Sequence, residues 1–272
     1  MFSSNPVTAR ARATYHAAAD CYDLPALSFW GRFGRATVAR LGLKDGQRVL
    51  DVCCGSGASA VPAAEAVGAG GRVLAVDLAL GLVELGKAKA ASRGLAQLEF
   101  RVGDFTELPA EAGSFDAVVC VFGIFFLPDM PAAVRALWRW VRPGGQLALT
   151  TWGPRVFEPA NAIFWEAVRE VRPELHKDFN PWDRIATPAA VTAMMREGGV
   201  EEVRAEAEAG THVLAAPQDW WSIVMGSGYR GTIEMLTEAE RQLVEARVRA
   251  EVVRRKVEAI ETNVVYARAV KR

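Results

Sequence analysis

One stretch, Val49–Ala60, limits most strongly how this chain can fold. A short run, Val49–Val52, is apolar except for Asp51 and leads directly into a turn with glycines at positions 55 and 57, followed by small helix-forming residues. A glycine has no Cβ, so a ligand can approach the backbone of such a turn closely. Free N–H groups at the start of the next helix can face a polar or anionic ligand group. The stretch predicts a strand, a ligand-binding turn and a helix, and alone it does not identify the ligand.

Apolar runs and helical patterns then alternate along the chain. Glycines at 68, 70 and 71 predict the end of the first helix, and Arg142–Gly145 predicts a sharp turn before the fifth strand. This alternation is typical of an α/β fold with a doubly wound, mostly parallel sheet. The expected helices are Ala58–Val67, Leu80–Ala91 and Met130–Val141, and the expected strands after Val49–Val52 are Arg72–Val76, Leu98–Val102, Ala117–Val121 and Gln146–Thr151.

Carboxylates follow two neighbouring strands. Asp77 ends the second expected strand and Asp104 follows the third. The carboxyl ends of parallel strands meet at one edge of the sheet, beside the glycine turn. One carboxylate can hold the hydroxyls of a ribose and the other the amino group of a purine. The alternative for Asp77, an exposed helix cap, is less favoured by its position beside Gly55 and Gly57.

The remaining segments predict a cap and two insertions. Residues 1–44 read as a helical cap with a break near Pro25, and residues 45–272 as the sheet domain. Tyr15, Tyr22 and Phe29 either face a ligand cleft or pack in the core. A Pro- and Trp-rich lid is expected at about 152–187, with a helix at Ala160–Val171. Further expected elements are a helix at Pro188–Glu197, a strand from Val200 to about Ala207, a helical insertion at about 217–255 and a last strand at Val257–Val270.

Charge and cysteine usage exclude several classes of function. Lys plus Arg and Asp plus Glu both total 32, so the net charge is zero and no basic field attracts nucleic acid. The four cysteines lack the spacing of metal ligands, which predicts no metal site and free thiols of a reducing cytoplasm. No apolar stretch reaches the roughly 18 residues of a membrane span. We expect a cytoplasmic protein, and the sequence leaves a homodimer open.

With these motifs in place, the chain resembles the class I S-adenosylmethionine-dependent methyltransferases, in particular the small-molecule branch with the ubiquinone and menaquinone C-methyltransferases. The resemblance implies a Rossmann-like, seven-stranded, mostly parallel sheet whose last strand is antiparallel, with an N-terminal helical cap and an insertion after strand five. The matching segments are Val49–Gly57, Asp77, Gly103–Phe105, Phe115–Asp116 with Val118–Gly123, and Arg142–Gly145.

The resemblance also implies roles for individual residues. Gly55 and Gly57 would let the backbone approach the methionine part of the cofactor, within a first motif that includes Asp51, Cys54 and Ser56. Asp77 would hold the ribose hydroxyls, and Leu78 would flank the adenine. Asp104 and the N–H of Phe105 would bind the adenine, and Val121 or Phe122 would lie along the methionine. Two departures stand out: Cys53 replaces a usual glycine, and Phe125 and Phe126 stand where relatives often have a histidine.

Methyl transfer from S-adenosylmethionine to an apolar or aromatic small molecule is the favoured function. The reagent is already activated, so the protein mainly aligns the reactants, and a base is useful only if the acceptor must lose a proton. The candidate catalytic residues are Tyr22, His176 and Tyr229; His16 is a further candidate, and His212 is expected to be structural. The chain lacks a Pro-Pro-Tyr run after the fourth strand, so nucleic-acid and protein amide targets are less favoured.

Two alternatives stay open at this point. A nicotinamide-dependent oxidoreductase is supported by the Gly55-x-Gly57-x-x-Ala60 spacing together with Asp77. The Asp104 motif, the Arg142–Gly145 turn and the absence of a Tyr-x-x-x-Lys pair count against it. The other alternative is a binding protein that keeps the S-adenosylmethionine pocket without turnover.

Overall fold

The computed structural model describes residues 6–272, and a seven-stranded sheet forms its centre. The strand order is β3-β2-β1-β4-β5-β9-β6. The strands from β3 to β5 pair in parallel, and β9 runs antiparallel to both of its neighbours. The predicted fold class is therefore confirmed. The strands are β1 Arg48–Val52, β2 Arg72–Asp77, β3 Leu98–Val102, β4 Phe115–Val121, β5 Val141–Trp152, β6 Arg204–Glu208 and β9 Val264–Val270.

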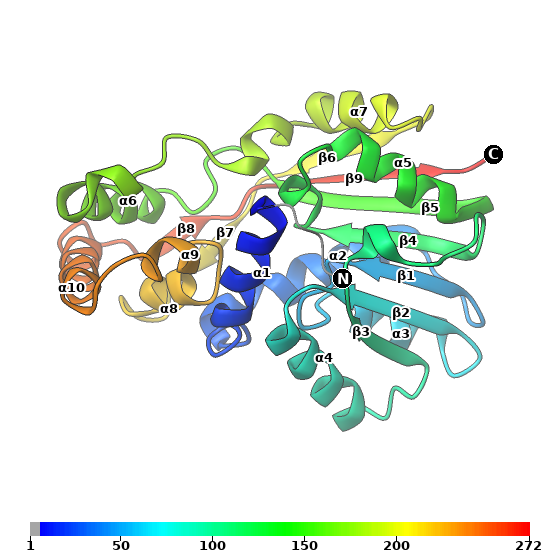
Figure 1. Cartoon of the computed structure of the whole chain (residues 1–272), viewed down its shortest axis with the longest axis horizontal. Coiled ribbons are helices and arrows are strands. Elements are labelled where there is room, and N and C mark those ends of the chain that lie inside the picture. The colour runs from blue at the N-terminus through cyan, green and yellow to red at the C-terminus, as the bar shows by residue number, and fades with distance from the viewer. Residues whose placement is uncertain (1–5) are drawn as a thin grey trace.

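Apolar residues make the central strands the core of the molecule. Val49, Leu50 and Val52 of β1 are fully buried, as are four consecutive residues of β4, Ala117–Cys120. Strands that are buried on both faces read as continuous apolar runs, which is the pattern of these segments. Helices flank the sheet: α2 packs against α3, and α5 packs against α7 (Figure 1). The flanking helices are α2 Phe29–Leu41, α3 Ala60–Val67, α4 Leu80–Ser92, α5 Met130–Trp140 and α7 Pro188–Glu197.

A second group of helices lies beyond one end of the sheet (Figure 1). In this group α6 packs along α10, and α1 packs against α9 and also reaches α4. The helix α1 thus lies between the helical group and the sheet. The helices of this group are α1 Pro6–Ala18, α6 Ala160–Val171, α8 Asp219–Met225, α9 Arg230–Ile233 and α10 Glu238–Arg254. Short 3₁₀ helices elsewhere in the chain are η1 Pro25–Leu27, η2 Phe105–Glu107, η3 Ile124–Phe126, η4 Pro173–Leu175 and η5 Pro181–Ile185. The division into a cap at 1–44 and a domain at 45–272 stays a prediction.

The predicted bounds differ most from the structure at two places. Arg142–Gly145 is not a separate turn before β5 but a bulge within it, because Phe115 pairs with Val141 and Ala117 pairs with Gln146. The backbone of Gly144 and Gly145 is held there by Lys271, whose carbonyl accepts at 2.7 Å and whose N–H donates at 2.9 Å. The single last strand predicted at Val257–Val270 is two strands.

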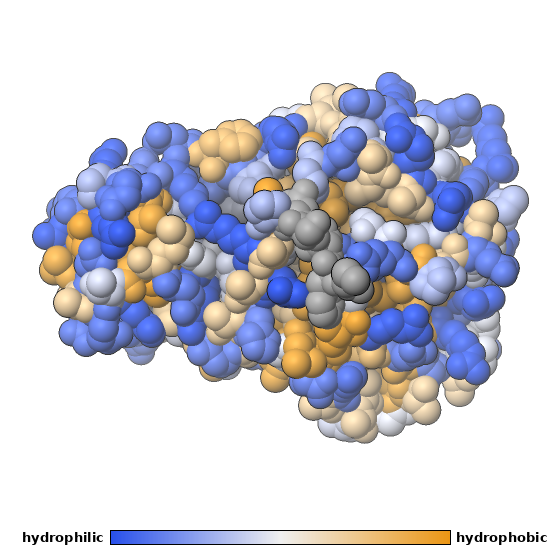
Figure 2. Space-filling model, in the orientation of Figure 1, coloured by the Kyte–Doolittle hydropathy of each residue, from blue (hydrophilic) through white to orange (hydrophobic). Residues whose placement is uncertain are grey.

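The first of these two strands leaves the main sheet. Strand β8 (Ala259–Glu261) pairs antiparallel with β7 (Thr211–Val213), and β9 begins after a break at Thr262 and Asn263. Within residues 6–272 no helix is both long and apolar enough to cross a membrane. Hydrophilic residues cover most of the face in Figure 2, and apolar residues gather around α4.

Candidate functional site

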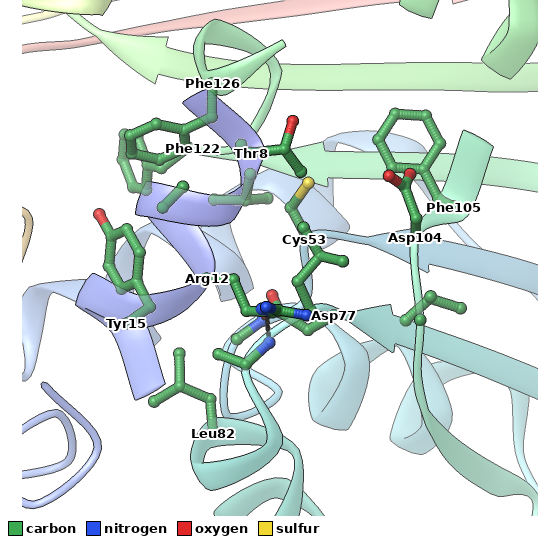
Figure 3. Close-up of a pocket in the computed structure, with 18 of the residues that line it drawn as sticks. Thr8, Arg12, Tyr15, Cys53, Asp77, Leu82, Asp104, Phe105, Phe122 and Phe126 are labelled. Carbon is green, nitrogen blue, oxygen red and sulfur yellow. Dashed lines mark hydrogen bonds between the residues drawn. The ribbon is translucent and has the colours of Figure 1, made fainter. Parts of the chain in front are cut away.

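A cavity opens at the carboxyl ends of β1, β2, β3 and β4, with α1 across its mouth (Figure 3). We call it the strand-end cavity. It brings together residues that are far apart in the sequence, as the crevice of a doubly wound sheet does. Of the predicted binding residues, seven line it: Gly55, Asp77, Leu78, Asp104, Phe105, Val121 and Phe122.

The two glycines of the first turn serve different purposes. Gly55 has φ +54°, and a Cβ placed there would lie 3.0 Å from the Tyr22 hydroxyl, so its absence keeps the space between the turn and Tyr22 clear. Gly57 has φ +90° and does not line the cavity. A Cβ at Gly57 would lie 2.8 Å from the ring of Phe100, so this glycine makes room for core packing.

Asp77 lies at the centre of the strand-end cavity (Figure 3). One carboxylate oxygen accepts a hydrogen bond from the N–H of Gly55 at 2.9 Å, and the other accepts from the N–H of Ala79 at 2.9 Å. Burial raises the pKa of Asp77, and these backbone N–H groups partly oppose that rise by stabilising the anion. The contacts fix the plane of the carboxylate, and each oxygen keeps a lone pair for a ligand hydroxyl.

Asp104 is buried and has one oxygen unused. Its Oδ1 accepts from the N–H of Thr106 at 2.9 Å and from the Thr106 hydroxyl at 2.7 Å. Within residues 6–272 no hydrogen bond reaches Oδ2, so this oxygen can accept from an amino group in the cavity. Phe105 follows at the start of η2 and also lines the cavity. The pair can therefore bind the edge of a purine.

Four predicted binding residues do not line the strand-end cavity: Asp51, Cys54, Ser56 and Gly57. Asp51 is buried in β1, where its Oδ2 accepts from the Ser59 hydroxyl at 2.7 Å while Oδ1 has no partner among the described residues. Burial raises the pKa of Asp51 to about 7. Asp51 is thus buried behind the turn, and any contact of these four residues with a cofactor stays a prediction.

Ser56 belongs to a network that ties the N-terminal segment to the glycine turn. Its hydroxyl donates to Asp23 Oδ1 at 2.8 Å, and Lys89 Nζ donates to the same carboxylate oxygen at 2.7 Å. Lys89 also donates to the Ser56 carbonyl at 3.0 Å. We call this network the Asp23 latch, because Asp23 follows directly on the cavity-lining Tyr22.

Two non-glycine residues with left-handed backbone lie in the wall. Cys53 and Phe122 both have φ +55° and both line the strand-end cavity. This conformation costs an ordinary residue about 1 kcal/mol or more, and such strain clusters at functional sites. A glycine at the Cys53 position would adopt the same backbone without strain, which accounts for the glycine usual in the family pattern.

Aromatic residues from the N-terminal segment close the cavity. Tyr15, Tyr22 and Trp30 line it, and the rings of Tyr22 and Trp30 stack at 5.4 Å. Phe29, in contrast, is buried in the core against Trp152 and Phe157, so the core alternative holds for it. Sequence reasoning missed Thr8 and Arg12 as lining residues; both lie on α1, and only the packing of this helix across the strand ends reveals the role.

A second and larger cavity adjoins the first. Its volume is about 410 Å³, and both cavities share Tyr15, Trp30 and Phe126 in their walls. We call it the aromatic cavity. The rest of its wall is rich in rings from the lid segment and the helical group, among them Phe157, Trp165, Trp182 and Tyr229.

The three candidate catalytic residues have different surroundings. Tyr22 lines the strand-end cavity, and Tyr229 lines the aromatic cavity, where its hydroxyl donates to Asn161 Oδ1 at 2.7 Å. Burial raises the pKa of both phenols, so at neutral pH they stay protonated and act as hydrogen-bond donors. His176 lines neither cavity; its Nδ1 lies 3.4 Å from Asp178 Oδ1 and its ring meets the edge of Trp165.

The other two histidines also lie outside both cavities. His16 Nδ1 accepts from the N–H of Gly81 at 3.2 Å. His212 lies in strand β7, and its Nε2 is 2.8 Å from the carbonyl oxygen of Ala26. Among the described residues, no cluster of three or more His, Cys, Asp or Glu side chains is arranged to hold a metal ion. The site therefore offers shape, hydrogen bonds and a fixed carboxylate pair, and no histidine base.

Comparison with known proteins adds an independent line of evidence. A family model described as a methyltransferase domain matches residues 49–145. Nocamycin O-methyltransferase of Saccharothrix syringae is 35% identical over 198 residues, which span 68% of this chain and 70% of that protein. Demethylmenaquinone methyltransferase of Oceanobacillus iheyensis is 37% identical over 111 residues, 41% of this chain and 47% of that protein.

A solved structure shares the fold. Phosphoethanolamine N-methyltransferase 2 of Haemonchus contortus, in complex with phosphomonomethylethanolamine and S-adenosylhomocysteine, superposes with a TM-score of 0.60. The alignment covers 98% of this chain and 60% of that chain at 17% identity. This likeness shows the fold alone.

Proposed function

The chain belongs to the S-adenosylmethionine-dependent methyltransferases, and on that premise we propose that it methylates an apolar or aromatic small molecule held in the aromatic cavity. The observation that supports this proposal is the junction of the two cavities. The strand-end cavity has the polar groups that suit a nucleoside, and the adjoining cavity has ring-rich walls that suit an apolar acceptor. A methyl group at the junction would face both.

The residues of the strand-end cavity fit S-adenosylmethionine. In this proposal Asp77 accepts the ribose hydroxyls, Asp104 Oδ2 accepts from the adenine amino group, and the open backbone at Gly55 faces the methionine part. Leu78 and Phe105 flank the adenine. The cofactor, when bound, supplies a methyl group that is already activated on a sulfonium.

The protein's own contribution is alignment and exclusion of water. Tyr15, Trp30 and Phe126 stand at the junction and shape the path along which an acceptor approaches in line. Tyr22 stays protonated and can donate a hydrogen bond beside Gly55. Because His176 lines neither cavity, we do not assign it a role at the reacting atoms; Tyr229 orients the wall of the acceptor cavity through Asn161.

Transfer of a labelled methyl group tests the proposal. The full chain is incubated with methyl-labelled S-adenosylmethionine and a panel of quinones, phenols and indoles, and label is counted in the organic extract. We expect transfer to at least one acceptor class with an equal amount of S-adenosylhomocysteine formed. Cofactor binding without transfer to any class would support the non-catalytic alternative, and saturable binding of NAD alone would contradict the proposed cofactor site.

Location and assembly are part of the same proposal. We propose a cytoplasmic location, since all four cysteines are free, as a reducing compartment favours. The homodimer stays a prediction that sedimentation equilibrium checks. Nucleic acid is not proposed as a partner because the net charge is zero.

A further inference from the structure

The charged residues that line the aromatic cavity all have the same sign. Arg10, Lys177 and Arg184 line it, and no aspartate or glutamate does so in the part of the chain that the structure describes. They come from α1, from the segment after η4 and from η5, so three separate elements place a cation at one cavity. In a protein with equal numbers of acids and bases, such an unbalanced wall is a specific feature of the cavity.

These cations lack the carboxylate partners that other basic residues of the chain have. Lys177 Nζ donates to Thr232 Oγ1 at 3.3 Å and lies 5.5 Å from the centre of the Trp165 ring. Arg10 Nη2 contacts the sulfur of Met235 at 3.3 Å. Arg184 makes no hydrogen bond or ion pair with any residue in 6–272. By comparison, Arg40 pairs with both Glu206 and Glu208.

The cations also influence one another. Burial lowers the pKa of Lys177, and the positive charge of Arg10 lowers it further. A bound anion would relieve this repulsion and favour the charged form of Lys177. The wall is therefore poised for a negative ligand group, and a cationic amine would meet repulsion there.

Uncharged groups of the same cavity are unsatisfied donors as well. The indole N–H groups of Trp30 and Trp165 and the hydroxyl of Ser227 are buried and have no hydrogen-bond partner among the described residues. An indole N–H can only donate, so its partner must be an acceptor atom. Because these atoms are not accessible to solvent, a ligand oxygen would reach them only after the side chains move.

Two acids near Tyr229 are engaged outside the cavity wall. Glu158 and Asp183 lie close enough to add to the burial that raises the pKa of Tyr229. Glu158 accepts from the side chain of Asn161 at 2.8 Å, and Asp183 accepts from the N–H of Asn180 at 2.7 Å. Neither lines the aromatic cavity, so neither neutralises the three cations from within it.

We propose that the methyl acceptor is an aromatic or polycyclic molecule with an anionic oxygen group, such as a carboxylate or an ionised phenol or enol, held by Arg10, Lys177 and Arg184. The apolar body lies among the rings of the aromatic cavity. This inference rests on the assignment of that cavity to the acceptor. It narrows the substrate class from apolar molecules in general to organic anions with an apolar body.

Matched pairs of acids and esters test the proposal by binding alone. The probes are benzoic, 2-naphthoic and 9-anthroic acids and their methyl esters, titrated into the full chain saturated with S-adenosylhomocysteine while tryptophan fluorescence is recorded. We expect at least one acid to bind about tenfold or more tightly than its ester, since hydrogen bonds between charged groups are stronger than those between neutral groups. This preference should weaken as the salt concentration rises.

Variants of two exposed residues test whether the cavity cations cause the preference for acid over ester. In Lys177→Met and Arg184→Gln the ratio of ester to acid dissociation constants should fall toward one. Lys87→Met and Arg249→Gln are the matched controls, because these residues are exposed and pair with Glu84 and Glu245 outside the cavity. Their ratio should equal that of the wild type.

The outcomes separate this inference from the proposed function. If no acid binds more tightly than its ester, or if the control variants change the ratio as much as the cavity variants, the anionic acceptor is wrong while cofactor binding is unaffected. If the chain fails to bind S-adenosylhomocysteine at all, the proposed cofactor site is wrong instead.

Discussion

Two backbone hydrogen bonds fix the carboxylate of Asp77 in the strand-end cavity. Its carboxylate plane is set by the N–H groups of Gly55 and Ala79, so its free lone pairs are aimed before a ligand arrives. A preorganised acceptor loses little entropy on binding, which would favour the hydrogen bonds to a ribose that we propose for Asp77.

Asp77→Asn should weaken the binding of S-adenosylhomocysteine by about tenfold or more, because a charged acceptor is replaced by a neutral one. Isothermal titration calorimetry measures the change. The 2′-deoxy analogue of S-adenosylhomocysteine is the matched ligand. It should bind the wild type more weakly than S-adenosylhomocysteine does, and the two ligands should bind the variant with nearly equal affinity. Equal loss with both proteins would show that the ribose hydroxyl is held elsewhere.

Cys53 offers a test of backbone strain. At φ +55° an alanine keeps the strain while a glycine removes it. Cys53→Gly should therefore have a higher free energy of unfolding than Cys53→Ala by about 1 kcal/mol, the reverse of the usual order for these two residues. Urea denaturation measures both. The usual order, with alanine the more stable, would contradict the assigned strain.

Asp51 makes stability depend on pH in a specific direction. Burial raises its pKa in the folded state to about 7, above the ordinary value of 3.8. Between these values the folded protein holds a proton that the unfolded chain has lost, so this group lowers the free energy of unfolding as pH rises.

Asp51→Asn removes that penalty. From pH 5 to pH 8 the stability of the variant relative to the wild type should rise by about 2 kcal/mol. Asp116→Asn is the control. Burial acts to raise the pKa of Asp116, but hydrogen bonds from Arg48 and Arg142 lower it overall. The difference in free energy of unfolding between Asp116→Asn and the wild type should therefore stay constant over this pH range. A flat difference for Asp51→Asn would mean that Asp51 is ionised in the folded protein.

At the scale of elements, the Asp23 latch connects the N-terminal segment to the cofactor turn. Lys89 of α4 and Ser56 of the turn both contact Asp23, next to Tyr22. If S-adenosylmethionine binds in the strand-end cavity as proposed, the Tyr22 segment lies over it, so the latch should slow its release.

Lys89→Met should speed the dissociation of S-adenosylhomocysteine several-fold in stopped-flow fluorescence. Lys87→Met, two residues away on the same helix, removes only an exposed pair with Glu84 and should leave the rate unchanged. Identical rates in the wild type and Lys89→Met would contradict a gating role for the latch.

Elements bounded by strong local signals were predictable from sequence. The strand Leu98–Val102 and the helices Ala160–Val171 and Pro188–Glu197 have the predicted bounds, each set by a proline, a glycine or a sharp change in polarity. The bulge at Arg142–Gly145 was read as a turn because proline and glycine signal both. Only the pairing with Phe115 and with Lys271 decides between them.

At the scale of the whole molecule, the carboxylates on strand ends are predictable from sequence, and the charged residues on the covering elements are not. Asp77 and Asp104 follow apolar runs whose parallel pairing dictates a common edge. Arg12 of α1 and Lys177 after α6 reach the two cavities through the packing of helices across the sheet, and no local pattern specifies that docking. The wall of the aromatic cavity therefore forms only when the helices pack across the sheet.

We propose that the strand-end cavity binds the cofactor with its sulfur toward the aromatic cavity. A crystal structure of the full chain with S-adenosylhomocysteine tests this proposal. We expect ribose hydroxyls on the Asp77 carboxylate, the adenine amino group on Asp104, and the sulfur at the junction lined by Tyr15, Trp30 and Phe126. A ligand bound elsewhere, or with its sulfur pointing away from that junction, would contradict it.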